Sequence, residues 1–312
     1  MILALAGGVG GAKLADGLAR VVAEQDLAIA VNTGDDFEHL GLRISPDLDT
    51  VMYTLAGIAN PATGWGQSGE TWAFMGALEK LGGPTWFRLG DRDLATHVER
   101  TQRLSRGETL SAVTRVLCER LGVAHRLIPM SDDPVPTRVR TDAGWLDFQH
   151  YFVREQCRPA LREVQYQNAD SAQPSVALRK ALSSSSLEGI VICPSNPYLS
   201  VAPILALPGV REAVRGARAV VAVSPIVGGE AIKGPAAKIM QELGLEVSAL
   251  GIARWYEGLA GTLVIDRVDS ALAPRIEALG MKAAVTDTIM RDAAGRARLA
   301  AECVSLVRQG RT

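Results

Sequence analysis

Residues 1–31, MILALAGGVGGAKLADGLARVVAEQDLAIAV, hold two short apolar runs separated by a glycine-rich turn and a stretch with helical periodicity. The spacing predicts a buried strand over Met1–Ala6, a turn over Gly7–Gly11, a helix over Ala12–Val22 and a second strand over Leu27–Val31. This order is that of a βαβ unit, whose two strands lie parallel.

The same alternation of apolar runs and helical stretches recurs in the C-terminal half. Further buried strands are predicted at three places: Gly189–Cys193, Ala219–Val223 and Thr262–Ile265. Helical spacing lies between and after them: Ala236–Leu243, Pro274–Leu279 and Asp292–Val307. We therefore predict an α/β fold with a Rossmann-like, doubly wound and mostly parallel sheet.

The chain between residues 137 and 183 has a different pattern. Polar and apolar residues alternate in TRVRT (137–141) and in GWLDFQHYFV (144–153), which predicts antiparallel strands. We interpret 137–183 as a smaller α+β insertion, with 1–136 and 184–312 forming the Rossmann-like domain.

Composition limits the classes of partner. Lys and Arg (33) nearly balance Asp and Glu (34), so the formal charge of −1 provides no broad positive field for a nucleic acid. No run approaches the roughly 20 apolar residues that span a bilayer, so we expect no membrane partner and a cytoplasmic location. The four cysteines are widely spaced and are interpreted as reduced core thiols.

The glycine turn is the first candidate site. Gly7, Gly8, Gly10 and Gly11 follow a strand and open a helix, so backbone N–H groups and the helix dipole can bind a phosphate. The third glycine of the dinucleotide fingerprint is replaced by Lys13, and no GK[ST] follows. A tight turn that serves packing alone is the alternative.

Two adjacent carboxylates, Asp35 and Asp36, follow the second strand in VNTGDD. Ligands of open α/β sheets bind at this end of the strands, and carboxylates beside a diphosphate suit Mg²⁺. We predict a Mg²⁺ site at Asp35 and Asp36; a solvated turn or a helix N-cap is the alternative.

Further charged residues gather in two later segments. In ISPDLDTVMY, Asp49 lies near a helix start, where it could cap the helix or face a ligand. In LGDRDLATH, Asp91 and Arg92 belong to a dense charged turn, and Arg92 could contact a phosphate or pair with a flanking aspartate. We interpret His97 as a structural histidine, because no other His or Cys falls at ligand spacing.

Together these motifs resemble one family. In chain order they are GGVGG, VNTGDD, ISPDLDTVMY, GWG with ETW, LGDRDLATH, PMSDDPV, PSNP and SPIVGG. The set is similar to the 2-phospho-L-lactate transferase family of coenzyme F420 biosynthesis, and it extends from about residue 4 to about residue 290.

The resemblance implies a reaction and a division of the site. The ribityl hydroxyl of the deazaflavin FO would attack the distal phosphorus of a guanosine diphosphate conjugate, and GMP would leave, with Mg²⁺ as cofactor. The Gly7–Gly11 turn and Ser195, Asn196 and Pro197 of PSNP would hold the donor. Asp49, Asp91 and Arg92 would line the deazaflavin side, and Asp36 or Asp49 would accept the hydroxyl proton. The family implies phospholactate, phosphoenolpyruvate or phosphoglycerate as the transferred acid.

Two other functions fit parts of the pattern. A nicotinamide-dependent oxidoreductase would share the βαβ opening, but it predicts an acidic ribose ligand where Asn32 stands. A non-catalytic deazaflavin- or nucleotide-binding protein would keep the pocket without turnover. For the assembly the only guide is that homodimers are the commonest state of soluble enzymes.

Overall fold

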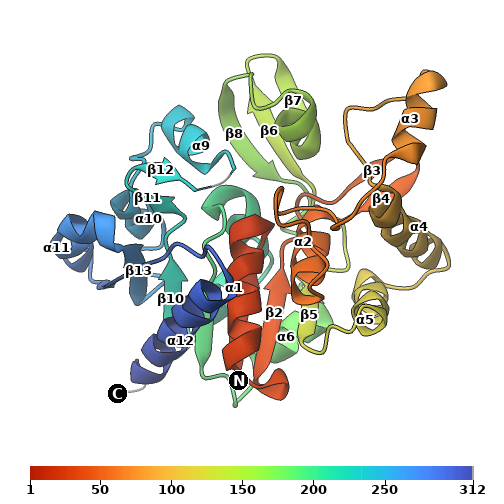
Figure 1. The fold of residues 1–312 in the computed structure, drawn as a ribbon. Coiled ribbons are helices and arrows are strands. Elements are labelled where there is room, and N and C mark those ends of the chain that lie inside the picture. Colours follow the sequence, from red (N-terminus) through yellow and green to blue (C-terminus); the bar gives the residue numbers. More distant parts are fainter. Residues whose placement is uncertain (233, 311–312) are drawn as a thin grey trace.

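The computed structural model describes residues 1–232 and 234–310, and a seven-stranded parallel sheet runs through its centre (Figure 1). In spatial order its strands are β14 (Lys282–Thr286), β13 (Thr262–Asp266), β10 (Val220–Val223), β9 (Gly189–Ile192), β1 (Ile2–Ala6), β2 (Leu27–Val31) and β5 (Arg126–Pro129). The short apolar runs form these strands because both faces of the sheet are covered. The predicted fold class is confirmed.

Strand order reverses at β1. The chain first builds outward from β1 through β2 to β5, and it later returns to place β9 on the other side of β1. The loops that leave β1 and β9 therefore lead to helices on opposite faces of the sheet. In open α/β sheets, ligands bind at such a switch point.

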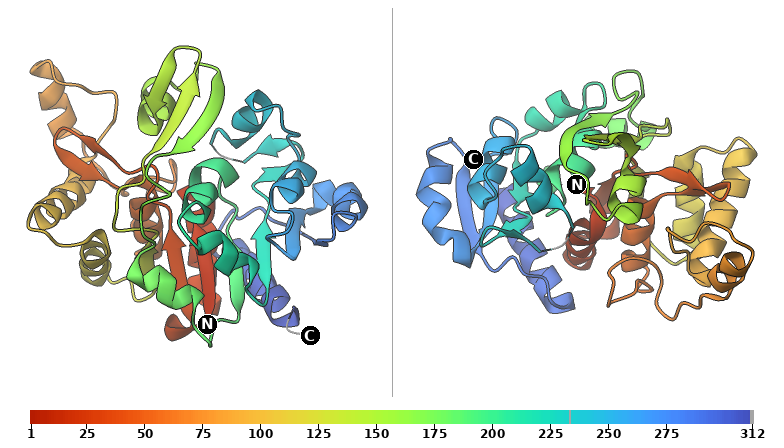
Figure 2. Two further views of the ribbon diagram at one scale, coloured as in Figure 1. Left: turned by 180° about the vertical axis from the view of Figure 1, so that it is seen from behind. Right: turned by 90° about the horizontal axis from the view of Figure 1, so that it is seen from above.

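Helices cover both faces (Figure 2). One face carries α1 (Gly8–Val21), α2 (Pro46–Leu55), α5 (Leu110–Arg120) and α12 (Ala293–Gln309). The other carries α6 (Val176–Leu182), α7 (Ala202–Leu205), α8 (Val210–Arg215), α9 (Ala236–Glu242), α10 (Ala249–Trp255) and α11 (Ala273–Glu277). Helix α1 begins at Gly8, so the predicted glycine turn is already its first turn.

Between β2 and β5 the chain forms an outer lobe with its own small apolar cluster. Its elements are β3 (Phe37–His39), β4 (Leu42–Ile44), α3 (Ala73–Lys80) and α4 (Asp91–Ser105). Buried Ile44, Met75 and Leu89 form the centre of that cluster. The lobe projects to the right of the central sheet in Figure 1.

A three-stranded antiparallel sheet lies above the carboxyl edge in Figure 1. It contains β6 (Thr137–Thr141), β7 (Gly144–Asp147) and β8 (Leu161–Tyr166). The strand predicted over 144–153 is wrong beyond Asp147, because 150–154 forms a turn of π-helix that buries Tyr151 beside Phe148 in the core. The limits 137–183 remain a prediction.

All four cysteines are free and buried, as expected of core thiols. Within the described residues, no helix combines the length and the apolar character that crossing a membrane requires.

Candidate active site

The loops that follow β1, β2 and β9 meet at the switch point. The N–H of Gly7, directly after β1, donates to Oγ of Ser195 after β9 at 3.2 Å. The N–H of Gly8 donates to Oδ1 of Asp47, in the first turn of α2, at 2.6 Å. A Cβ at Gly10 would collide with the carbonyl oxygen of Pro194. Three predicted segments are thus in contact, and glycine is required for their close approach.

Asn32, at the end of β2, connects these loops. Its side-chain amide donates to Asp35 at 3.2 Å, to Asp47 at 3.0 Å and to the carbonyl of Leu199 at 3.2 Å. Its Oδ1 accepts the N–H of Gly34. A dinucleotide-binding protein would carry a carboxylate free for a ribose here, whereas Asn32 is buried and committed to the loops.

The predicted metal ligands are adjacent in the chain, in the loop that follows β2. Asp35 is buried and lies 3.4 Å from the amide nitrogen of Gln149. Asp36 accepts a hydrogen bond from Ser45 at 2.7 Å through Oδ2, while its buried Oδ1 has no hydrogen-bond partner in the described part of the chain. Burial, followed by the charges of Asp47 and Asp36, raises the pKa of Asp35 well above its ordinary value. Burial likewise raises the pKa of Asp36.

Asp47 completes the acidic group. Burial raises its pKa to about 6, although hydrogen bonds from Asn32, Gly8 and Ser200 act in the opposite direction. Carboxylates that are buried together and repel one another need a compensating cation to ionise fully. The unpartnered Oδ1 of Asp36 and the hard oxygen chemistry of these carboxylates suit Mg²⁺, although the described Asp35, Asp36 and Asp47 side chains do not share the mutual spacing of metal ligands.

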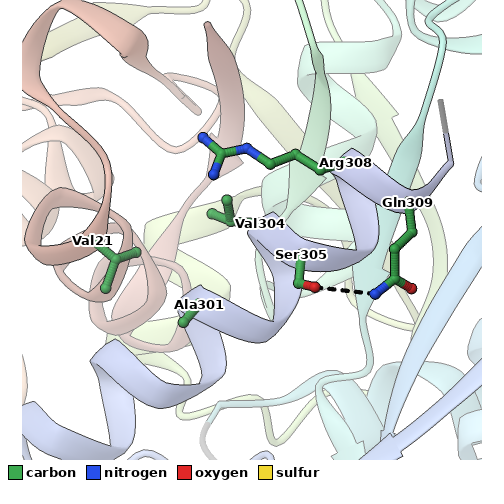
Figure 3. A pocket seen from close by; sticks show the side chains of 6 residues that line it. All are labelled: Val21, Ala301, Val304, Ser305, Arg308 and Gln309. Carbon is green, nitrogen blue, oxygen red and sulfur yellow. Dashed lines mark hydrogen bonds between the residues drawn. The ribbon is translucent and has the colours of Figure 1, made fainter.

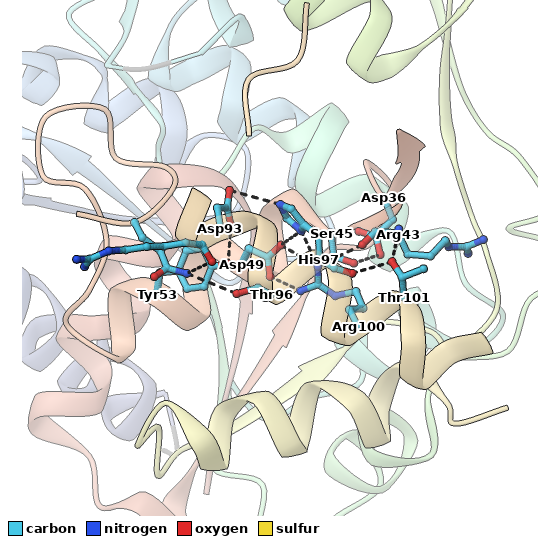
Figure 4. A network of polar contacts seen from close by, with 12 residues as sticks. Asp36, Arg43, Ser45, Asp49, Tyr53, Asp93, Thr96, His97, Arg100 and Thr101 are labelled. Carbon is cyan, nitrogen blue, oxygen red and sulfur yellow. Dashed lines mark hydrogen bonds and ion pairs between the residues drawn. The ribbon is translucent and has the colours of Figure 1, made fainter. Parts of the chain in front are cut away.

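Asp49 lies in the first turn of α2 and faces the outer lobe (Figure 4). Arg100 of α4 binds it with both terminal nitrogens, at 3.0 Å to Oδ2 and also to Oδ1. His97 lies behind this pair, with Nδ1 3.2 Å from Arg100 and Nε2 3.4 Å from Asp93. The hydroxyl of Tyr53 donates to Asp93 at 2.6 Å.

One group of three described side chains, Asp49, Asp93 and His97, has the mutual spacing of metal ligands. The contacts favour a different role. Because Arg100 can only donate, Nδ1 of His97 accepts, and the proton of a neutral ring is then on Nε2, toward Asp93. That nitrogen has no lone pair for a metal, so we interpret the group as an ion-pair network.

Asp91 and Arg92 are in the outer lobe, at the start of α4. The carboxylate oxygens of Asp91 accept hydrogen bonds from the hydroxyl of Thr71 and from the N–H groups of Ala73 and Phe74 at the start of α3. The exposed Arg92 donates to the carbonyl of Ser68 at 3.3 Å. Both side chains hold lobe segments together, and their place beside the deazaflavin remains a prediction.

Ser195, Asn196 and Pro197 form the turn after β9. Oδ1 of Asn196 caps the following π-helical turn (197–201) by accepting the N–H groups of Tyr198 and Leu199. Its Nδ2 is buried and has no partner among the described residues. Local sequence pattern does not single out Asn32, Ser45, Gln149 and Arg100 as site residues, because their roles depend on contacts with other segments of the chain.

A surface pocket of about 410 Å³ lies elsewhere, at the far ends of α1 and α12 (Figure 3). Its lining comprises Val21, Ala301, Val304, Ser305, Arg308 and Gln309. Helix α1 runs 14 residues, about 21 Å, from the glycine turn to Val21. We therefore do not assign this pocket to the carboxyl-edge site.

Comparison with known proteins agrees with the motifs. The family model described as 2-phospho-L-lactate transferase CofD matches residues 2–302. A phosphoenolpyruvate transferase from Streptomyces griseus is 40% identical, with 99% of both chains covered. A 2-phospho-L-lactate transferase from Methanosarcina mazei is 37% identical over 93% of this chain and 94% of its own.

The fold has a counterpart among solved structures. A member of the UPF0052 family from Bacillus halodurans superposes with a TM-score of 0.61 at 14% identity, covering 97% of this chain and 98% of that one. At this identity the likeness concerns the fold alone. The sequence match over nearly the whole chain shows the family: this protein belongs to the 2-phospho-L-lactate transferase family of coenzyme F420 biosynthesis.

Proposed function

We propose that this protein transfers a phospho-acid group from a guanosine diphosphate conjugate to the ribityl hydroxyl of FO and releases GMP. The observation that carries the proposal is the meeting of three loops at the switch point. The glycine turn, which is suited to bind a phosphate, contacts the Ser195–Pro197 turn and Asp47, and Asp47 in turn contacts Asn32 of the acidic loop after β2.

The donor phosphates would bind at the start of α1. The first N–H groups of a helix have no partner within the helix, and its dipole favours an anion there. Gly7 and Gly8 already donate to Ser195 and Asp47, which leaves the N–H groups of Val9 and Gly10 for the phosphates. Asn196, with its unpartnered Nδ2, would contact the nucleotide.

Asp35 and Asp36 are the proposed Mg²⁺ ligands. Mg²⁺ would neutralise the negative charge of the phosphates and of the buried carboxylates. Ser45 and Gln149 orient the two carboxylates through their contacts with Asp36 and Asp35.

In the transfer, the hydroxyl oxygen of FO forms a bond to the distal phosphorus, and the bond from that phosphorus to the bridging oxygen breaks. The electron pair and the bridging oxygen leave with GMP. The hydroxyl proton passes to a carboxylate, for which we propose Asp36 or Asp49. Such reactions depend chiefly on positioning and on charge stabilisation.

The transferred acid is phospholactate, phosphoenolpyruvate or phosphoglycerate. We place phosphoenolpyruvate first, because relatives from Streptomyces and Kitasatospora that are named phosphoenolpyruvate transferases are 40–41% identical and cover 99–100% of this chain. The methanogen relatives named as 2-phospho-L-lactate transferases are 36–38% identical.

The test is a mass-spectrometric assay of the purified protein with FO, Mg²⁺ and each guanylylated donor in turn. An Asp35→Ala, Asp36→Ala double variant is assayed beside it. The matched control removes two exposed carboxylates of the small sheet, Asp142 and Asp147, which pair with surface arginines.

We expect the FO adduct from one donor with wild-type protein and with the control, and its loss in the double variant. FO binding without an adduct from any donor would instead identify a non-catalytic deazaflavin-binding protein. Equal turnover by the double variant and the wild type would exclude Asp35 and Asp36 as metal ligands.

A further inference from the structure

We propose that Arg100 is a positioning residue, which orients the Asp49 carboxylate and couples the outer lobe to the active site. The inference rests on the proposed function, because it assigns Asp49 to the reacting end of the candidate site. Arg100 belongs to α4 in the outer lobe, whereas Asp49 belongs to α2, which packs on the central sheet. Their pairing joins two parts of the molecule.

The contact has the geometry that fixes a carboxylate. Two terminal nitrogens of Arg100 bind the two oxygens of Asp49, so the plane and the direction of the carboxylate are both set. Arg100 is only 2% exposed, and Asp49 is 5% exposed. Water therefore screens this pair little, and thermal rotation of Asp49 would break two charge-assisted hydrogen bonds.

Arg100 also contacts His97 of the same helix. Its nitrogen lies 3.2 Å from Nδ1 of His97, and the opposite ring nitrogen faces Asp93 at 3.4 Å. The hydroxyl of Tyr53, one turn beyond Asp49 on α2, donates to Asp93 at 2.6 Å. The network closes on itself across α2 and α4, which is the arrangement of a rigid support rather than of a mobile surface pair (Figure 4).

Arg100 also supplies a positive charge beside buried carboxylates. Asp35, Asp47 and Asp49 are buried, and Arg100 pairs its positive charge directly with Asp49. A guanidinium keeps its charge at every physiological pH. The lobe thus contributes a fixed cation to a site built by the central sheet.

The test compares Arg100→Lys, Arg100→Met and a matched control, Arg103→Met. Arg103 is on the same helix and pairs with Glu99 and Glu108, away from Asp49. With FO, Mg²⁺ and the accepted donor, we expect kcat of Arg100→Met to fall at least about 100-fold, the scale of losing one preorganised electrostatic contact. KM for both substrates should stay within about threefold, because Arg100 does not touch them.

Arg100→Lys is the conservative variant and guards against loss of folding in Arg100→Met. It keeps the charge but lacks the two-pronged geometry, so kcat should recover only in part and remain about tenfold below wild type. Wild-type kcat in Arg100→Lys, or an equal loss in Arg103→Met, would overturn the proposal. A rise in KM with unchanged kcat would also overturn it.

A second readout separates this inference from the proposed function. Hydrogen exchange of the peptides that cover α2 and α4 should accelerate in Arg100→Met and stay unchanged in Arg103→Met. If the wild-type protein shows no turnover with any donor, the proposed function fails, and exchange still decides whether Arg100 fixes α2. Unchanged exchange in Arg100→Met would contradict the coupling of lobe and site.

Discussion

At the scale of single residues, burial of the aspartates of the candidate site opposes folding. Asp35, Asp36 and Asp47 are held close together out of water, and burial raises the pKa of each. A protein selected for stability alone would not keep them ionised together. This cost agrees with our proposal that a divalent cation binds at Asp35 and Asp36.

We expect Asp35→Asn to stabilise the metal-free protein. The amide removes a buried charge that Asp47 and Asp36 repel, and Gln149 can turn its own amide to bond the new side chain. Because burial and two neighbouring carboxylates disfavour the charged form, the free energy of unfolding at pH 8 should rise by about 1 kcal/mol or more, the scale on which removal of a poorly compensated buried charge stabilises proteins.

Urea unfolding in EDTA measures this gain, with Asp142→Asn as the surface control. Added Mg²⁺ should raise the stability of the wild type and should stabilise the variant less. A less stable Asp35→Asn protein in EDTA would show that the carboxylate is a structural anchor instead.

Some residues of the candidate site can be predicted from local sequence, and others cannot. Asp35, Asp36 and Asp49 stand out locally, because each lies next to a predicted strand end or helix start. Arg100 does not, since its partner is 51 residues away and an arginine in an amphipathic helix is normally exposed. Only the docking of α4 on α2 makes it a buried cation.

At the scale of elements, the start of α1 depends on the absence of side chains. Gly10 lies against the backbone of Pro194 in the loop after β9, and main chain cannot move aside as a flexible side chain can. The residues of this turn therefore determine how closely the β1 and β9 loops approach.

Gly10→Ala should lower the free energy of unfolding by about 1–3 kcal/mol, the usual range for overpacking. The matched control is Gly76→Ala in α3, where a Cβ meets open space and should add about 0.5–1 kcal/mol of stability. Thermal unfolding of both variants decides the matter. A Gly10→Ala protein as stable as the control would mean that the two loops are not in contact in solution.

The carboxylate of Asp266 connects the end of β13 to the segment that follows β14. It ends β13 and accepts hydrogen bonds from the N–H and hydroxyl of Thr288 and from the N–H of Val268. Burial alone would raise its pKa, but these hydrogen bonds outweigh burial and lower it. The folded-state pKa is thus below the unfolded one, so its stabilisation is present above about pH 4 and is lost as pH falls further.

Asp266→Ala should lower the free energy of unfolding by about 1–3 kcal/mol at pH 7, and this loss should become smaller below pH 4. Chemical denaturation of both proteins across this range measures it. A cost that stays constant down to pH 3 would mean that the hydrogen bonds do not depend on the charge.

Elements were predictable where local pattern and burial agree. Strands β1, β2, β9, β10 and β13 coincide with apolar runs because they are enclosed on both faces. Residues 148–153 were predicted as strand, yet the apolar side chains of Phe148 and Tyr151, three positions apart, suit one face of a helical turn equally well. Packing of these side chains against the core favours the helical turn over a strand.

At the scale of the whole molecule, the chain has three parts: the central domain, the outer lobe and the small antiparallel sheet. The central domain provides the glycine turn, for which we propose phosphate binding, and the acidic loop after β2. The lobe reaches the site through Arg100, and the π-helical segment after β7 follows Gln149, which contacts Asp35. The resemblance of the motifs to a known family indicated this site before its geometry could be described, whereas the packing of the lobe required the structure.

The most direct test of the account is product stoichiometry in the wild-type reaction. Purified protein is incubated with FO, Mg²⁺ and guanylylated phosphoenolpyruvate, and mass spectrometry quantifies the FO adduct and the released nucleotide. The account predicts one GMP for each phosphodiester-linked FO adduct and no GDP. Release of GDP in place of GMP, or nucleotide release without an FO adduct, would contradict it.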